Sequence, residues 1–109
     1  MITILGLSTC DTTKLALKTL TQKDIPARLR DIRAEPLSDQ EIDQIVTEFG
    51  DRAVNKQSTT YRGFSAFLKE SESEVQIAQA PAVMKRPVIT DGTAWTLGWD
   101  AAIEARWTA

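Results

Sequence analysis

Histidine is absent from this 109-residue chain, and cysteine occurs once, at Cys10. One thiol and no imidazole exclude an intramolecular disulfide and a zinc site built from the usual cysteine and histidine ligands. They also exclude a serine–histidine or cysteine–histidine pair, so imidazole takes no part in acid–base catalysis. Any nucleophilic chemistry by sulfur therefore depends on Cys10, and we expect neither a metal nor a bound cofactor.

The chain also lacks a strong charge imbalance and a long apolar run. Its formal net charge of −2 argues against a general polyanion binder, because non-specific affinity for nucleic acid needs many basic contacts to phosphates. Asp11, Lys14 and Lys18 interrupt the N-terminal apolar stretch, so it has the length of neither a secretory signal nor a membrane span. We expect a cytoplasmic monomer that contacts neither nucleic acid nor membranes.

The composition indicates one folded domain over residues 1–109, because 42% of the residues are hydrophobic and 26% are charged. Apolar residues predict a buried strand at 2–6, followed by a helix at 13–23. Residues 27–32 alternate between apolar and charged side chains, which is typical of a strand. These segments predict a strand–helix–strand unit with parallel strands.

The clearest helical pattern begins at Ser38. Ser38 and Glu41 have the spacing of a capping box, and Leu37 and Ile42 have the spacing of a hydrophobic staple. Gly50 supplies the stop signal.

Residues 51–80 are less regular. We expect Phe64, Phe67 and Leu68 to share one helical face packed into the core, and Ser71 with Glu74 to open another short helix. Residues 38–80 are therefore interpreted as a helical insertion.

A hairpin is predicted near the C-terminus, because an Asp-Gly turn at 91–92 separates strand-like segments at 88–90 and 93–96. Asp100 then caps a last helix in which Ile103 and Trp107 share a face. The resulting order is βαβ, helices, ββ, α. It matches an α/β thioredoxin-like fold with a mixed central sheet and a helical insertion.

Cys10 lies at the junction between the first predicted strand and helix. A helix start presents backbone N–H groups without acceptors and carries partial positive charge, which lowers the pKa of a thiol placed there. The carboxylate of Asp11 acts in the opposite direction, so a positive group from elsewhere in the chain is needed. Position alone leaves two interpretations open: a nucleophile, or a small buried residue without reactivity.

Several segments together resemble the ArsC family of arsenate reductase-like proteins, and within it the YffB subgroup beside Spx-type regulators. They are CDTTK at 10–14, TTYR at 59–62, KRPVI at 85–89 and LGW at 97–99. The resemblance implies a thioredoxin-like fold with Pro87 as its cis proline. It also implies that Arg86 approaches Cys10 and supplies the positive group, so that these two are the catalytic residues.

The sequence departs from the arsenate reductases that it resembles at three places. The stretch GLST at 6–9 lacks their His-Asn-Pro element, Lys56 stands where a second arginine is expected, and the third position, near 97–99, is apolar. One arginine and one lysine hold a doubly charged oxyanion weakly, because lysine lacks the forked donors of arginine. Arsenate reduction itself is therefore not expected.

Spx-type regulators resemble this chain but sense oxidants through a Cys-x-x-Cys pair, whose second position is Thr13 here. The expected chemistry is monothiol: Cys10 attacks a disulfide or accepts glutathione, and an external thiol resolves the product.

We therefore expect a glutathione-dependent monothiol oxidoreductase, with glutathione as co-substrate. The amides of Thr12 and Thr13 help Arg86 to stabilise the thiolate, and Lys56 and Arg62 bind carboxylates of the ligand. The expected ligand-binding residues are Thr12, Thr13, Lys56, Arg62 and Pro87. Two alternatives stay open: a regulator or adaptor that binds a protein such as RNA polymerase, and a domain in which the thiol is buried and inert.

Overall fold

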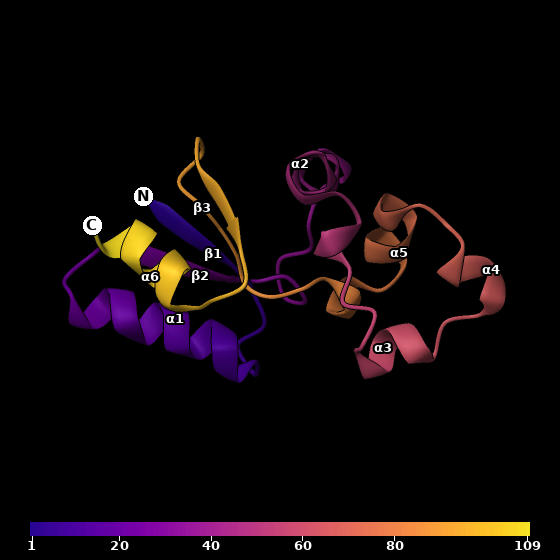
Figure 1. Cartoon of the computed structure of the whole chain (residues 1–109), viewed down its shortest axis with the longest axis horizontal. Helices are drawn as coiled ribbons and strands as arrows, with labels where there is room; N and C mark the ends of the chain where they lie inside the picture. The colour runs from indigo at the N-terminus through magenta and orange to yellow at the C-terminus, as the bar shows by residue number, and fades with distance from the viewer. The chain divides into compact units, whose positions relative to one another are not determined.

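A computed structural model describes all residues of the chain, 1–109, which form two compact units (Figure 1). Unit 1 consists of Met1–Glu35 and Arg86–Ala109, and unit 2 consists of Pro36–Lys85. Residues 38–80, expected as a helical insertion, all belong to unit 2. None of the helices combines the length and the apolarity needed to cross a membrane.

A four-stranded mixed sheet forms the centre of unit 1. Its strands are β1 (Ile2–Gly6), β2 (Ala27–Asp31), β3 (Val88–Thr90) and β4 (Trp95–Leu97), in the order β2-β1-β3-β4. β1 pairs in parallel with β2 and antiparallel with β3, which pairs antiparallel with β4. Helix α1 (Asp11–Gln22) makes the crossover that a parallel pair requires. The predicted strand–helix–strand unit is confirmed.

The core of unit 1 lies between the sheet and two helices, α1 and α6 (Ala101–Thr108), which pack on the same face (Figure 1). Ala16 and Leu20 are four residues apart in α1 and therefore share its inner face. The buried cluster consists of Ile4, Ala16, Leu20, Ile89 and Trp107. This packing fixes the start of α1, and with it Cys10, relative to the ends of the strands.

The β3–β4 hairpin has a longer turn than predicted. Thr90 pairs directly with Trp95, so residues 91–94 form the turn and the predicted strand at 93–96 is wrong at its first two positions. The carboxylate of Asp91 accepts the N–H groups of Thr93 (2.9 Å) and Ala94 (2.8 Å), which holds these residues in the turn.

Unit 2 is helical. It contains α2 (Asp39–Phe49), α3 (Thr59–Arg62), α4 (Ala66–Lys69) and α5 (Ser73–Gln79), with 3-10 turns at Gly50–Ala53 and Pro81–Val83. The capping box of α2 is confirmed: Ser38 Oγ accepts the Glu41 N–H (3.1 Å), and Glu41 Oε1 accepts the Ser38 N–H (2.8 Å). Gly50 ends α2 at a φ of 62°, a conformation that glycine adopts without strain.

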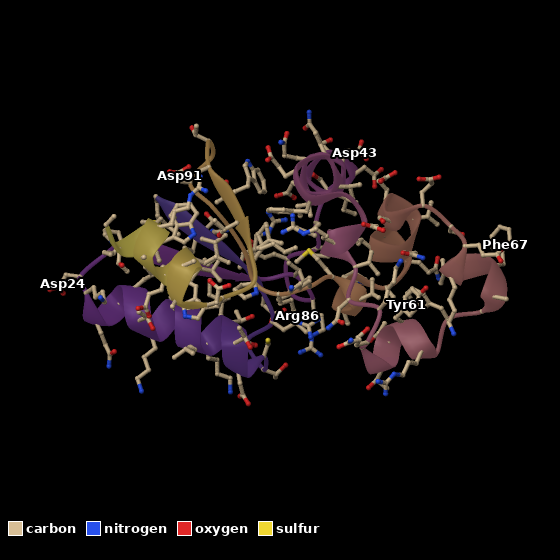
Figure 2. All side chains as sticks on the ribbon, viewed as in Figure 1. Asp24, Asp43, Tyr61, Phe67, Arg86 and Asp91 are labelled. Atoms are coloured by element: carbon tan, nitrogen blue, oxygen red, sulfur yellow. The ribbon has the colours of Figure 1, made fainter.

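Two expectations for unit 2 are wrong. Phe67 does not pack into a core, because its side chain is 81% exposed at α4 (Figure 2). Helix α4 has only four residues, which is too short for a repeating inward face. Ser71 does not cap the next helix either: its hydroxyl donates to Phe67 O (2.9 Å), and α5 begins after Glu72.

Candidate thiol site

Cys10 is the N-cap residue of α1 and has extended backbone angles (φ −85°, ψ 121°). Its N–H donates to Leu7 O (2.9 Å), and its C=O accepts the Lys14 N–H (3.0 Å), the first bond of the helix. Cys10 is partly exposed, so the burial assumed by the alternative of an inert thiol is wrong. This position directs the free N–H groups of the first helical turn toward sulfur.

Thr13 lies one turn into α1, fully buried, and its side chain faces the thiol. The hydroxyl has no oxygen or nitrogen partner. A neutral thiol accepts hydrogen bonds weakly, whereas a thiolate accepts them strongly, so ionisation of Cys10 supplies the acceptor that this hydroxyl lacks. A Cβ at Gly6 would overlap the Thr13 side chain, and glycine at the end of β1 therefore leaves the room that Thr13 occupies.

Arg86 and Pro87 enter the site from the segment that leads into β3. The Arg86–Pro87 peptide bond is cis, as the family resemblance implied. Pro87 is fully buried, and its C=O accepts the Gly98 N–H (2.8 Å). The half-buried Arg86 side chain hydrogen-bonds to Cys10. The structure thus places the positive charge of Arg86 beside the Cys10 sulfur.

Opposing effects determine the acidity of Cys10. Burial is the largest single influence and raises its pKa, but hydrogen bonds from the side chain and amide of Thr13, from the Arg86 side chain and from the Thr12 amide together lower the pKa below that of an ordinary cysteine. The expected opposing effect of Asp11 is not among these causes. The Asp11 carboxylate is fully exposed, and one of its oxygens lies 3.9 Å from Lys14 Nζ.

Sequence reasoning missed the residues that hold the loop before Cys10. Asp31, at the end of β2, accepts the N–H (2.9 Å) and the hydroxyl (2.7 Å) of Ser8 and the N–H of Arg33 (2.8 Å). These bonds hold the pKa of the Asp31 carboxyl far below its ordinary range. Arg33 in turn donates to Thr9 Oγ1 (2.7 Å). The parallel register pairs Gly6 with Asp31, the last residues of β1 and β2, and so brings together the loops that follow these two strands. This register is the signal that would have revealed the contact between Asp31 and Ser8.

The structure brings four of the predicted residues together in unit 1: Cys10, Thr12, Thr13 and Arg86. Lys56 and Arg62 belong to unit 2 instead. Lys56 Nζ lies 3.9 Å from Asp51 Oδ2, and Arg62 is exposed at the end of α3. Ligand binding by these two cations stays a prediction.

Unit 1 thus defines the class of protein: an α/β fold with a mixed sheet and a single thiol at a helix N-terminus. Solved structures share this fold across the whole chain. A YffB protein aligns with a TM-score of 0.91 and 22% identity, over 100% of both chains. A possible arsenate reductase from Streptococcus mutans aligns at 0.78 with 21% identity, over 97% of both chains. An arsenate reductase (ArsC) related protein from Brucella melitensis aligns at 0.76 with 22% identity, over 97% of this chain and 92% of that one.

Sequence relatives identify the family. An uncharacterized protein of Haemophilus influenzae is 40% identical over 100 residues, 86% of this chain and 88% of the relative. Global transcriptional regulator Spx 2 of Lactococcus lactis is 31% identical over 107 residues, 92% of this chain and 80% of the relative. No family model matches. The chain belongs to the family of the Spx proteins, and it has the thioredoxin-like α/β fold of the YffB and ArsC-related proteins.

Proposed function

We propose that this protein is a glutathione-dependent monothiol oxidoreductase with the Cys10 thiolate as its nucleophile. The observation that carries the proposal is the lowered pKa of Cys10, caused by hydrogen bonds from Thr13, Arg86 and Thr12 that outweigh burial. The thiolate is the attacking species in thiol–disulfide exchange, so a lower pKa increases its fraction at neutral pH. The thiol is also partly exposed, as attack on a substrate requires.

The reaction has two exchange steps. In the first, the Cys10 thiolate attacks the glutathione sulfur of a mixed disulfide, a new Cys10–glutathione S–S bond forms, and the substrate sulfur leaves as a thiolate that takes a proton from water. In the second, a glutathione thiolate attacks the glutathione sulfur bound to Cys10. Oxidised glutathione forms and Cys10 leaves as a thiolate. Overall, the mixed disulfide and one reduced glutathione are converted into the substrate thiol and oxidised glutathione, and the protein returns to its starting state.

The same hydrogen bonds serve both steps. Thr13 and Arg86 stabilise negative charge on Cys10 sulfur when it is the nucleophile and again when it is the leaving group. Lys56 and Arg62 are proposed to bind the carboxylates of glutathione through charge-assisted hydrogen bonds. Arsenate is not proposed as the substrate, because Lys56 replaces an arginine and residues 97–99 carry no charge.

The test is mass spectrometry of the intact protein after incubation with oxidised glutathione. We expect one glutathione adduct per chain, its removal by reduced glutathione, and no adduct on Cys10→Ser. Arg86→Gln should slow adduct formation, whereas Arg106→Gln, which removes the same charge from an exposed position on α6, should not. The absence of any adduct on the wild-type chain would overturn the proposal.

A second candidate function is a protein-binding regulator, favoured by the 31% identity to two Lactococcus lactis proteins named as global transcriptional regulators Spx. This chain would then bind RNA polymerase, and with Thr13 in place of a second cysteine it would do so without an internal disulfide. Affinity capture of purified RNA polymerase by wild type and by Cys10→Ser, with and without oxidant, tests this role. Equal capture in all four cases indicates an adaptor that is independent of the thiol, and no capture rejects the candidate.

A further inference from the structure

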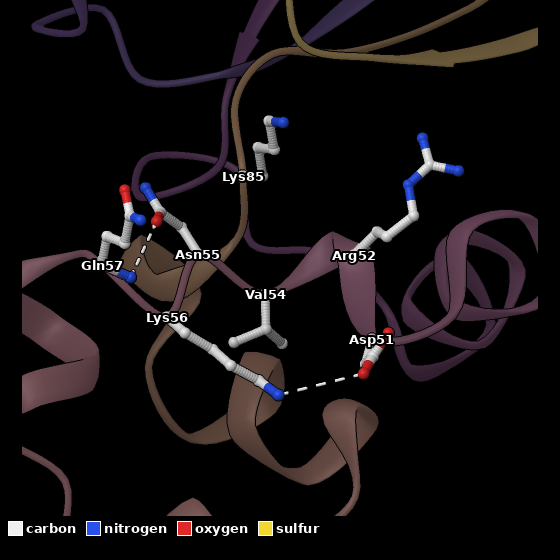
Figure 3. A pocket seen from close by; sticks show the side chains of 7 residues that line it. All are labelled: Asp51, Arg52, Val54, Asn55, Lys56, Gln57 and Lys85. Carbon is white, nitrogen blue, oxygen red and sulfur yellow. Dashed lines mark hydrogen bonds and ion pairs between the residues drawn. The ribbon is translucent and has the colours of Figure 1, made fainter.

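Unit 2 contains a pocket of about 550 Å³ beside the 3-10 turn that follows α2 (Figure 3). This volume lies within the range of about 300–1,000 Å³ that is typical of small-molecule sites. Its polar lining consists of Asp51, Arg52, Asn55, Lys56, Gln57 and Lys85. The thiol chemistry proposed above gives no role to Arg52, Asn55 or Lys85.

Paired backbone segments build the pocket. Lys85 N–H donates to Ala53 O (2.7 Å), and Asn55 N–H donates to Val83 O (2.8 Å). These bonds flank an antiparallel bridge between Val54 and Met84. All four apolar residues of this pairing are buried. The side chain of Lys85 is thereby held on the same short ladder as the residues of the 52–57 segment.

The charges of the lining are mostly positive. Three cations and one carboxylate give the pocket a net charge of +2, in a chain whose formal net charge is −2. Lys56 Nζ lies 3.9 Å from Asp51 Oδ2, so these two charges offset each other. In Figure 3 no dashed line joins the side chain of Arg52 or Lys85 to another lining residue, and neither residue takes part in an ion pair. Two cations therefore remain available to an anion.

The neutral polar groups are donors as well. Asn55 Oδ1 accepts the Gln57 N–H (3.0 Å), which engages the oxygen end of this amide within the 52–57 segment and leaves its NH₂ group as a donor for a ligand. The one carboxylate is already engaged with Lys56. A lining with unpaired guanidinium, ammonium and amide donors complements phosphate or carboxylate oxygens.

We propose that this pocket binds a small anionic ligand through its phosphate or carboxylate groups, and that binding does not depend on Cys10. Arg52 and Lys85 supply the charge, and Asn55 donates a neutral hydrogen bond. Two probes distinguish the chemistry of the ligand: inorganic pyrophosphate carries phosphate charge alone, and S-methylglutathione carries carboxylates with its thiol blocked.

The experiment is an NMR titration of the ¹⁵N-labelled full chain with each probe, following the amides of residues 52–57 and 85. At least one probe should give saturable shifts confined to these amides. The double variant Arg52→Gln/Lys85→Gln should weaken binding roughly tenfold or more, because it removes two charge-assisted hydrogen bonds. The control Lys18→Gln/Lys23→Gln removes the same net charge from exposed positions in and beside α1 and should leave the affinity unchanged.

The outcomes separate this pocket from the thiol reaction. Shifts with pyrophosphate alone assign a phosphate ligand, and shifts with S-methylglutathione assign the carboxylates of glutathione. In either case Cys10→Ser should bind the probe as the wild type does, although it forms no glutathione adduct. The proposal is overturned if neither probe gives saturable shifts, or if the two double variants lose affinity equally while their amide spectra show that both are folded.

Discussion

At the scale of single residues, the two threonines after Cys10 act on the thiol in different ways. Thr13 contributes through its side chain and its amide, whereas Thr12 contributes through its amide alone. Thr13 is fully buried and Thr12 is exposed. Replacing both hydroxyls in turn therefore separates hydrogen bonding by the Thr13 hydroxyl from the general effect of a helix N-terminus.

The first prediction is that Thr13→Val raises the pKa of Cys10 and Thr12→Val leaves it unchanged. Valine preserves the shape of the buried side chain but donates no hydrogen bond to the thiolate. The rate of alkylation by iodoacetamide at pH 7 should fall roughly tenfold in Thr13→Val, because a hydrogen bond to a charged group is lost. The pKa is measured from alkylation rates between pH 5 and 10. Equal pKa values for the two variants would refute a role for the Thr13 hydroxyl.

The second prediction concerns Asp31, whose carboxylate holds Ser8 in the loop before Cys10. The pKa of the Asp31 carboxyl is lower in the folded protein than in the unfolded chain, where it is about 3.9. The ionised carboxylate therefore stabilises the folded state at pH values above the unfolded-state pKa, and this stabilisation is lost as the pH falls toward the folded-state pKa. Asp31→Asn should therefore lower the free energy of unfolding at pH 7, and the difference from wild type should shrink below about pH 4.

Urea unfolding of both proteins at several pH values measures this difference. Asp43→Asn is the matched control, because Asp43 is exposed on α2 and engages in no hydrogen bond with the loop. A difference between wild type and Asp31→Asn that is the same at pH 7 and pH 3 would show that the carboxylate charge is not what holds Ser8.

At the scale of elements, sequence signals predicted structure where local chemistry determines it. The box of Ser38 and Glu41 defines the start of α2 through contacts three residues apart. The four-residue helix α4 has no repeat long enough to reveal its outer face, so the exposure of Phe67 was not predictable. The role of Asp31 depends on the register between β1 and β2, which composition and periodicity leave undetermined.

The C-terminal helix shows how a polar contact joins elements in the core. Trp107 of α6 donates its indole N–H to Thr96 Oγ1 of β4 at 2.7 Å, and both residues are buried. Apolar packing brings α6 to the sheet, while this bond satisfies the one polar group that Trp107 buries.

The third prediction is that Thr96→Val destabilises the protein by about 1–3 kcal/mol, because the indole N–H is left buried without an acceptor. The exposed turn substitution Thr93→Val is the control and should have little effect. In the double variant Thr96→Val/Trp107→Phe the indole donor is absent as well, so the loss of stability should be smaller than the sum of the losses in Thr96→Val and Trp107→Phe. Urea unfolding of Thr96→Val, Trp107→Phe, the double variant and Thr93→Val measures these losses, and strict additivity of the two single losses would show that the bond contributes nothing.

At the scale of the whole molecule, composition determines which groups titrate near neutral pH. The chain has no histidine and one cysteine, so Cys10 is the side chain whose ionisation is expected to control sulfur chemistry in this range.

The fourth prediction is a pH profile with one ascending step and a plateau for attack by the protein on a small neutral disulfide under single-turnover conditions. The lowered pKa of Cys10 keeps the thiolate present at pH values where an ordinary cysteine is protonated, and the rate falls only as the pH drops through that lowered pKa. The midpoint should lie below about 8.5, the value for a free cysteine, and should rise in Arg86→Gln. No descending limb is expected, because the chain has no imidazole to act as a general acid.

Stopped-flow measurement of the released thiol gives the pH profile of the rate. A bell-shaped curve would show that a second titrating group takes part, and a midpoint at the ordinary value would remove the physical basis for Cys10 as an activated nucleophile.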